Sequence, residues 1–405
     1  MKKSIYPLLA FVALTASILS CAIPFGGSDT PESQDNVATV VASTLQALTP
    51  NAPGTTQPAP SGLLPRTLYF LSNDSAGLTQ VFRIEKDGKT QKQLTFEPAK
   101  VADYDVSAID GSIAYISNNQ LLWVGSDGSG RRVLVDGGEV IPDMPFVSSV
   151  SDPVWSPNSQ TIAYGHKGLN FYAVATGISN RAIENQIDDF SGLSVPRELY
   201  WPERYSPDGS KLVITLGYYE GASAAIYYPA GNAVVRLTGG EGALICCGET
   251  EWTADGSSFF AASPSMGMFN PGLWRVNAST GAVTTLLSAD AGNGTYNFAD
   301  EPFLAPDGQL YFFFANLAQT DEFVSRTPLQ LVRSAPDGVT GRTVVNADNF
   351  QLMNEALWAP DASFVIVAYA PLREVYQGGQ AEIVHLDGRP NVVLAPFAIN
   401  MKWGP

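Results

Sequence analysis

One short motif returns along the chain and constrains the fold more than any other feature. It consists of an aromatic or apolar residue, one or two small residues or a proline, and then Asp or Asn, usually before Gly. The copies are Val106–Gly111, Val154–Asn158, Arg204–Gly209, Glu251–Gly256, Phe303–Gly308 and Leu357–Asp361. Their Asp or Asn residues lie 47 to 54 residues apart. Such regular spacing indicates a repeated structural unit.

Each copy leads into a short run of β-branched and aromatic residues, such as Thr161–Tyr164 and Phe364–Val367. A Pro-Asp-Gly turn between two apolar runs predicts a β-hairpin. A second turn follows about 20 residues later, as at Ser126–Gly128 and Pro336–Gly338. Two hairpins per repeat give four strands, and four-stranded units in a closed ring form a β-propeller.

The two ends of the repeated region predict how the ring closes. Arg66–Leu71 matches the second strand of a unit, and no first strand precedes it. Asn400–Pro405 matches a first strand with nothing after it. Together they complete one unit, which leaves no sheet edge open. We therefore expect an all-β fold, a seven-bladed β-propeller over residues 66–405, closed by a blade shared between the N- and C-terminal strands.

The Trp-Ser-Pro-Asp-Gly pattern resembles the WD40-like, Pro-Asp repeat of TolB-type propellers. The resemblance covers the whole of residues 66–405, with about five good copies. It implies a propeller lipoprotein of the bacterial cell envelope that binds a protein or a glycan without catalysis. It says little about activity, because propellers serve both as binding proteins and as enzymes.

The beginning of the chain predicts export. Lys2 and Lys3 precede an apolar stretch that is too short and too near the terminus for an ordinary membrane span, so residues 1–20 read as a signal peptide. Ile18–Cys21 resembles a bacterial lipobox, which implies that Cys21 is lipidated. The alternative is an ordinary secretory peptide with an incidental cysteine. Residues 21–65, rich in Pro, Thr and Ser, predict a flexible tether.

We therefore expect a protein that is lipid-anchored to a bacterial membrane and faces the periplasm or the cell exterior. Its net charge is −16, and a phosphate-binding surface must be basic, so nucleic acid is excluded as a partner. His166 and His385 are the only histidines, which excludes an all-histidine metal site. No Gly-x-Ser-x-Gly elbow, phosphate loop or dinucleotide fingerprint is present. These absences favour a non-catalytic protein, which we expect to be a monomer.

Propeller geometry also predicts which face binds. The Pro-Asp-Gly turns and the second turns lie on one face and are short, whereas the connections on the opposite face are longer. Long loops on a rigid scaffold are common binding sites. They include Ile187–Trp201, which carries Trp201, and Ala370–Gln380, which carries Tyr376. The alternative is that such aromatic side chains only pack the loops onto the ring.

Acidic residues recur three positions before the aromatic position of the motif. The seven equivalent residues are Tyr104, Asp152, Pro202, Glu249, Glu301, Glu355 and Asn400. They begin the innermost strands, so we expect them to surround the channel mouth on the long-loop face. Clustered carboxylates raise one another's pKa or require a cation or a hydrogen-bond donor.

Two interpretations of these acids stay open. They form a rim that binds Ca²⁺, an amine, a sugar or a basic peptide, or each accepts backbone N–H groups and latches a neighbouring blade. The rim also supports an alternative function, that of a carbohydrate-active or lactone-cleaving enzyme, with or without Ca²⁺. We name Tyr104, Asp152, Glu249, Glu301, Glu355, Asn400 and Trp201 as candidate ligand-binding residues.

Cys246 and Cys247 are adjacent and lie just before Glu249. An exported protein meets oxidising conditions, which permit a disulfide. Adjacent Cα atoms are only about 3.8 Å apart, which is below the usual range for a disulfide, so a bond between these two would be strained. A vicinal disulfide, two free thiols, and a metal or redox role remain as alternatives.

Overall fold

The computed structural model describes residues 62–405, apart from residues 143, 191, 220, 240–249, 266–269 and 319–325. The predicted signal peptide, Cys21, Cys246, Cys247 and Glu249 lie outside the described residues. The chain divides into two units, of which Pro60–Pro405 contains everything described below. Among the described residues, no helix has the length and apolar character needed to cross a membrane.

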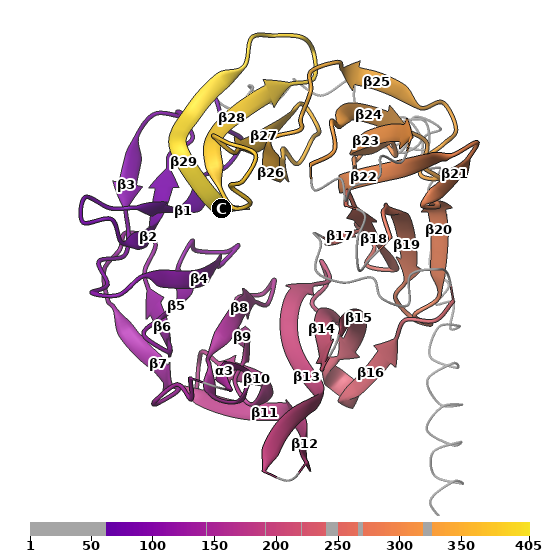
Figure 1. Cartoon of the computed structure of the whole chain (residues 1–405). Coiled ribbons are helices and arrows are strands. Elements are labelled where there is room, and N and C mark those ends of the chain that lie inside the picture. The colour runs from indigo at the N-terminus through magenta and orange to yellow at the C-terminus, as the bar shows by residue number, and fades with distance from the viewer. Residues whose placement is uncertain are drawn as a thin grey trace, which may run out of the picture. The chain divides into compact units, whose positions relative to one another are not determined.

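The described part of the chain is almost entirely β-structure, as predicted. Its helical elements are limited to α3 (Pro145–Ser148) and a short 3-10 turn at Pro229–Gly231. The strands pair antiparallel into six sheets, and within the unit Pro60–Pro405 these sheets follow one another around a ring (Figure 1).

Three of the sheets come from the first half of this unit. One contains β4 (Val101–Val106), β5 (Ile113–Ser117), β6 (Gln120–Val124) and β7 (Arg132–Asp136). The next contains β8 (Ser151–Trp155), β9 (Thr161–Gly165), β10 (Gly168–Ala173) and β11 (Ile178–Glu184). The third contains β12 (Gln186–Phe190), β13 (Leu193–Tyr205), β14 (Leu212–Tyr218), β15 (Gly221–Tyr228) and β16 (Ala233–Arg236).

The other three sheets follow in the ring. The first contains β17 (Thr250–Trp252), β18 (Ser258–Ser263), β19 (Gly272–Asn277) and β20 (Val283–Leu287). The second contains β21 (Asp290–Gly292), β22 (Thr295–Leu304), β23 (Leu310–Ala318), β24 (Gln330–Ser334) and β25 (Thr343–Asn346). The last runs, in hydrogen-bonded order, through β26 (Met353–Trp358), β27 (Phe364–Tyr369), β28 (Gly379–His385), β29 (Val392–Trp403), β1 (Leu68–Asn73), β2 (Thr79–Ile84) and β3 (Gln91–Gln93).

The last sheet joins the first and last strands of the ring. The first part of β29 pairs with β28, for example Ala395 with Ala381. Its end pairs with β1, where Trp403 lies opposite Leu68 and Lys402 opposite Tyr69. β29 therefore serves two groups of strands, because it is long enough to pair with a different partner along each half.

The repeated motif builds the hairpins by local hydrogen bonds. Between β13 and β14, the Asp208 carboxylate accepts hydrogen bonds from the Ser206 hydroxyl at 2.6 Å and the Ser210 amide at 3.0 Å. Gly209 follows with a φ of +71°, a left-handed conformation that glycine adopts without a steric penalty. Asp255 makes the same contacts with Thr253 and Ser257 in the next repeat. The hydroxyl residue, the aspartate and the glycine of the motif are therefore the residues that build the turn.

The hydrophobic core lies between neighbouring sheets. One cluster joins Phe313 of β23 to Val365 and Val367 of β27. Phe303 and Trp358 stack across the same boundary, with ring centroids 5.5 Å apart and planes 8° from parallel. Because apolar side chains fill these boundaries, the innermost strands can present polar side chains to the centre of the ring.

Two expectations about loops and linkers need correction. The predicted tether 21–65 extends too far, because Leu64 is fully buried and its amide donates to the Lys86 carbonyl at 2.9 Å. The predicted loop Ile187–Trp201 is instead a hairpin of β12 and β13, in which Ile187 pairs with Pro196. Trp201 therefore lies on a strand, opposite Thr215 of β14.

Candidate functional site

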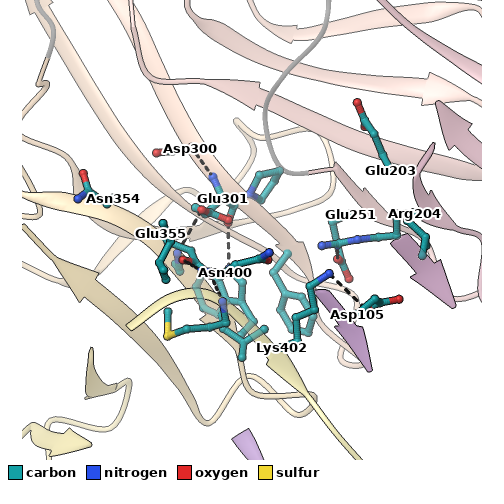
Figure 2. A pocket seen from close by; sticks show the side chains of 18 of the residues that line it. Asp105, Glu203, Arg204, Glu251, Asp300, Glu301, Asn354, Glu355, Asn400 and Lys402 are labelled. Atoms are coloured by element: carbon teal, nitrogen blue, oxygen red, sulfur yellow. Dashed lines mark hydrogen bonds and ion pairs between the residues drawn. The ribbon is translucent and has the colours of Figure 1, made fainter. Parts of the chain in front are cut away.

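The innermost strands surround a central cavity of about 1400 Å³. It reaches from residues beside the short turns, such as Pro157 and Pro360, to residues of the opposite loops, such as Pro264 and Tyr376. Among the described residues, eight acidic side chains line it: Asp103, Asp105, Asp152, Glu203, Glu251, Asp300, Glu301 and Glu355. The cationic residues of the described lining are Arg204 and Lys402. Figure 2 shows both cations and six of these acids around this space: Asp105, Glu203, Glu251, Asp300, Glu301 and Glu355.

The cavity brings together most of the predicted ligand-binding residues that the structure describes. Asp152, Glu301, Glu355 and Asn400 line it. Tyr104 is fully buried, and its hydroxyl donates to the Asn400 carbonyl at 2.7 Å, so it supports the wall from behind. Trp201 is half-buried and packs over Gly217. Neither Tyr104 nor Trp201 is among the lining residues described for this cavity.

β-Bulges in the innermost strands set the direction of several of these side chains. Asp152, Glu301 and Asn400 have left-handed backbones, with φ values of 50°, 47° and 55°. The pairing register shifts around Asp152 and around Glu301. A bulge redirects side chains and interrupts pairing, and a left-handed conformation is costly for a residue such as Glu. The same distortion at equivalent positions explains why the sequence register identified them together.

Two of the predicted acids are latches between neighbouring groups of strands. Glu301 on β22 accepts a hydrogen bond from the Ala356 amide of β26 at 3.1 Å. Glu355 on β26 accepts the Asn400 amide of β29 at 2.7 Å and also the Met401 amide. Hydrogen bonds to an ionised acceptor are stronger than neutral ones. For these two side chains the latch interpretation describes the observed contacts.

Asp105 is a third latch. It directly follows Tyr104, the equivalent residue of its repeat, and so is not one of the seven residues of the acidic register. Its carboxylate accepts the Trp155 amide of β8 at 2.6 Å and pairs with the Lys402 ammonium at 3.2 Å. It therefore links strands β4, β8 and β29. A search that allowed one residue on either side of the register would have included it.

Asp103, Asp152 and Lys402 form a half-buried group of ionisable side chains beside this latch. Asp103 accepts the Asn400 side-chain amide at 2.5 Å. Burial raises the pKa of Asp103 to about 7, although Lys402 opposes the shift. Burial also raises the pKa of Asp152. Burial opposes protonation of Lys402, but Asp105 and Asp103 raise its pKa. We therefore expect Asp103 to change charge near neutral pH.

Arg204, the other cationic residue of the described lining, is also ion-paired. Its guanidinium on β13 lies 3.1 Å from the Glu251 carboxylate of β17, and this pair joins two further sheets at the cavity wall. Glu203 accepts the Thr215 hydroxyl. Within the part of the chain that the structure describes, no group of three or more His, Cys, Asp or Glu side chains is arranged to hold a metal ion.

Replacing Glu355 with Gln tests the latch. Gln keeps the shape but loses the charge and one of the two acceptor oxygens, so we expect the free energy of unfolding to fall by about 1–3 kcal/mol. Glu139→Gln, at an exposed position, is the matched control and should change it by less than about 0.5 kcal/mol. Urea denaturation measures both. A Glu355→Gln protein more stable than wild type would show that repulsion outweighs the latch.

The raised pKa of Asp103 predicts how stability depends on pH. An acid with a raised pKa holds its proton more tightly in the folded protein, so it destabilises the fold progressively as pH rises from about 4 to about 7. The melting temperature of Asp103→Asn, minus that of wild type, should therefore increase through this window and level off above it. Asp87→Asn is the control, because a hydrogen bond from Thr90 lowers the pKa of Asp87 to about 2. An equal pH profile for both variants would refute the assignment.

Comparison with known proteins shows the fold and leaves the function open. No family model matches the chain, and no curated protein matches it. It is similar to an oligogalacturonate lyase in complex with manganese, at 8% identity over 81% of this chain and 84% of that one, with a TM-score of 0.51. Prolyl oligopeptidase B from Galerina marginata is 11% identical over 82% of this chain but only 49% of its own, also with a TM-score of 0.51. TolB from Acinetobacter baumannii, of the type that the repeats resemble, is 14% identical over 83% and 82% of the chains, with a TM-score of 0.42.

Proposed function

We propose that this protein is a lipid-anchored envelope protein that binds a positively charged segment of a partner protein in its central cavity, without catalysis. One observation carries the proposal: in the part of the chain that the structure describes, eight acidic residues and two cationic ones line the cavity. Both cations are already ion-paired, Arg204 with Glu251 and Lys402 with Asp105. The excess negative charge favours a ligand that brings cations of its own.

The shape of the cavity strengthens this preference. Low-dielectric walls around charges of one sign concentrate their field, which raises the local concentration of oppositely charged ligands. A cationic segment would also relieve the repulsion among the carboxylates. Burial and neighbouring acids disfavour the charged form of Asp103, and a bound cation would favour it. An uncharged ligand would gain neither effect.

A rigid ring would make such a site effective. We infer that the seven-stranded sheet consists of two four-stranded blades that share β29, which gives seven blades with the other five sheets. The pairing of β29 with β1 supports this closure. A closed ring holds its cavity in one shape, so little entropy would be lost when a ligand binds.

The proposed location rests on the beginning of the sequence. A Cys21→Ala variant should be exported and folded but should leave the membrane fraction, because the ring does not depend on the lipid. Sedimentation of cell fractions in high salt, followed by immunoblotting, measures this. A variant that still sediments with membranes would show that Cys21 is not the anchor.

Hexalysine is a suitable probe for the cavity. We expect wild type to bind it with an affinity that falls as salt is added. Glu203→Gln combined with Asp300→Asn should weaken binding about tenfold, which corresponds to roughly 1.4 kcal/mol. Isothermal titration calorimetry measures the dissociation constants.

The control combines Glu139→Gln with Glu184→Gln, which removes the same charge from exposed positions outside the cavity. It should leave binding within about twofold of wild type. If the control weakens binding as much as the cavity variant, the attraction is a general surface effect and the proposal fails. Binding of neutral oligosaccharides but not of hexalysine would favour a glycan ligand instead.

A further inference from the structure

Arg326 is an almost completely buried arginine beside the cavity, with 7% of its surface exposed. It precedes β24, yet its guanidinium reaches the connection between β27 and β28. Its Nε donates to the Arg373 carbonyl at 2.8 Å, and its Nη2 donates to the Val375 carbonyl. Nη2 also donates to the Asn354 side-chain oxygen at 2.7 Å. A planar guanidinium is well suited to hold several oxygens in fixed directions.

Asn354 holds the same loop from the opposite direction. Its side-chain amide donates to the Val375 carbonyl at 3.2 Å and to the Gly378 carbonyl at 2.6 Å. Arg326 and Asn354 thus bond both to each other and to three carbonyl groups of the segment 373–378. We call this pair the loop clamp. It fixes an exposed loop on a strand of the ring.

The clamped segment forms part of the cavity wall. Tyr376, Gln377 and Gly378 line the cavity, as does Asn354. The Arg326 guanidinium lies 5.0 Å from the centre of the Tyr376 ring, so one side of the ring is supported. Tyr376 is nevertheless 58% exposed. A supported but exposed aromatic ring is a low-entropy contact surface of the kind that dominates many binding sites.

We infer that Arg326 is a positioning residue that holds Tyr376 at the edge of the cavity, where its ring contacts the aliphatic stem of a bound lysine or arginine. This inference rests on the proposed function. Lysine and arginine bury their methylene groups against apolar surface while their charged ends stay in polar surroundings. The ring would receive the stem, and the carboxylates of the cavity would receive the charged end.

Trypsin cleavage tests the loop clamp without any ligand. Arg373 is exposed, but its carbonyl is held by Arg326. In Arg326→Met we expect cleavage after Arg373 at least about tenfold faster than in wild type, because an unclamped loop can open locally and expose its backbone. Arg389→Met, which removes an exposed arginine from the β28–β29 turn, is the control. Trypsin should cleave this variant after Arg373 at the wild-type rate.

The affinity for hexalysine then tests the role of the Tyr376 aromatic ring. Arg326→Met and Tyr376→Ala should each weaken binding about fivefold or more, whereas Tyr376→Phe should stay within about twofold of wild type. If Arg326→Met fails to fold, Asn354→Ala replaces it, since that change removes only the bonds made by the amide.

Two results would overturn the inference while leaving the proposed function intact. One is a wild type that binds hexalysine and a Tyr376→Ala variant that binds it equally well. The other is an Arg326→Met variant with wild-type resistance to trypsin at Arg373. A wild type that does not bind hexalysine contradicts the proposed function and, with it, the ligand contact of Tyr376, whereas the trypsin comparison still decides whether the clamp exists.

Discussion

The pairing between β29 and β1 is the constraint on which the described ring depends. It brings Trp403 opposite Leu68 and so joins strands that are more than 300 residues apart in the sequence. Trp403 also connects this pairing to β26, because its indole N–H donates to the Trp358 carbonyl at 2.7 Å. Contacts that close so long a loop carry a large entropic cost, and the many contacts of neighbouring sheets together offset it.

The latches use the same residues that give the cavity its charge. Glu301, Glu355 and Asp105 each accept a backbone N–H from the next group of strands. A carboxylate suits this position because it accepts several hydrogen bonds, and each is strengthened by the negative charge. An assembly fastened in this way at its centre acquires an acidic lining as a consequence. The proposed preference for cations thus follows from how the ring is held together.

Much of this arrangement can be predicted from the sequence, and the reasons are local. The turn at Asp208–Gly209 needs those residue types for its hydrogen bonds and its left-handed glycine, so the motif reports the hairpins directly. The acidic register is visible because Asp152, Glu301 and Asn400 occupy the same bulge in different repeats. Tyr104 occupies that register too, but its position behind the wall depends on the packing of adjacent sheets.

The loop clamp lies beyond such prediction. Arg326 and Asn354 are separated by 28 residues and belong to no repeated pattern. Their meeting depends on where the connection between β27 and β28 folds back, which no local signal encodes. The hairpin of β12 and β13 is also hard to predict, because a proline such as Pro196 argues against a strand, although it is tolerated opposite Ile187 at the irregular edge of this sheet.

Native-state hydrogen exchange tests the closure of the ring most directly. If β29 and β1 close it, the amides of Tyr69 and Leu71 should exchange only through global unfolding, with the same free energy as the amides of central strands such as β14 and β27. Exchange of these terminal strands at a much lower free energy, as for fraying chain ends, would contradict the account, because the ring would then open where its ends meet.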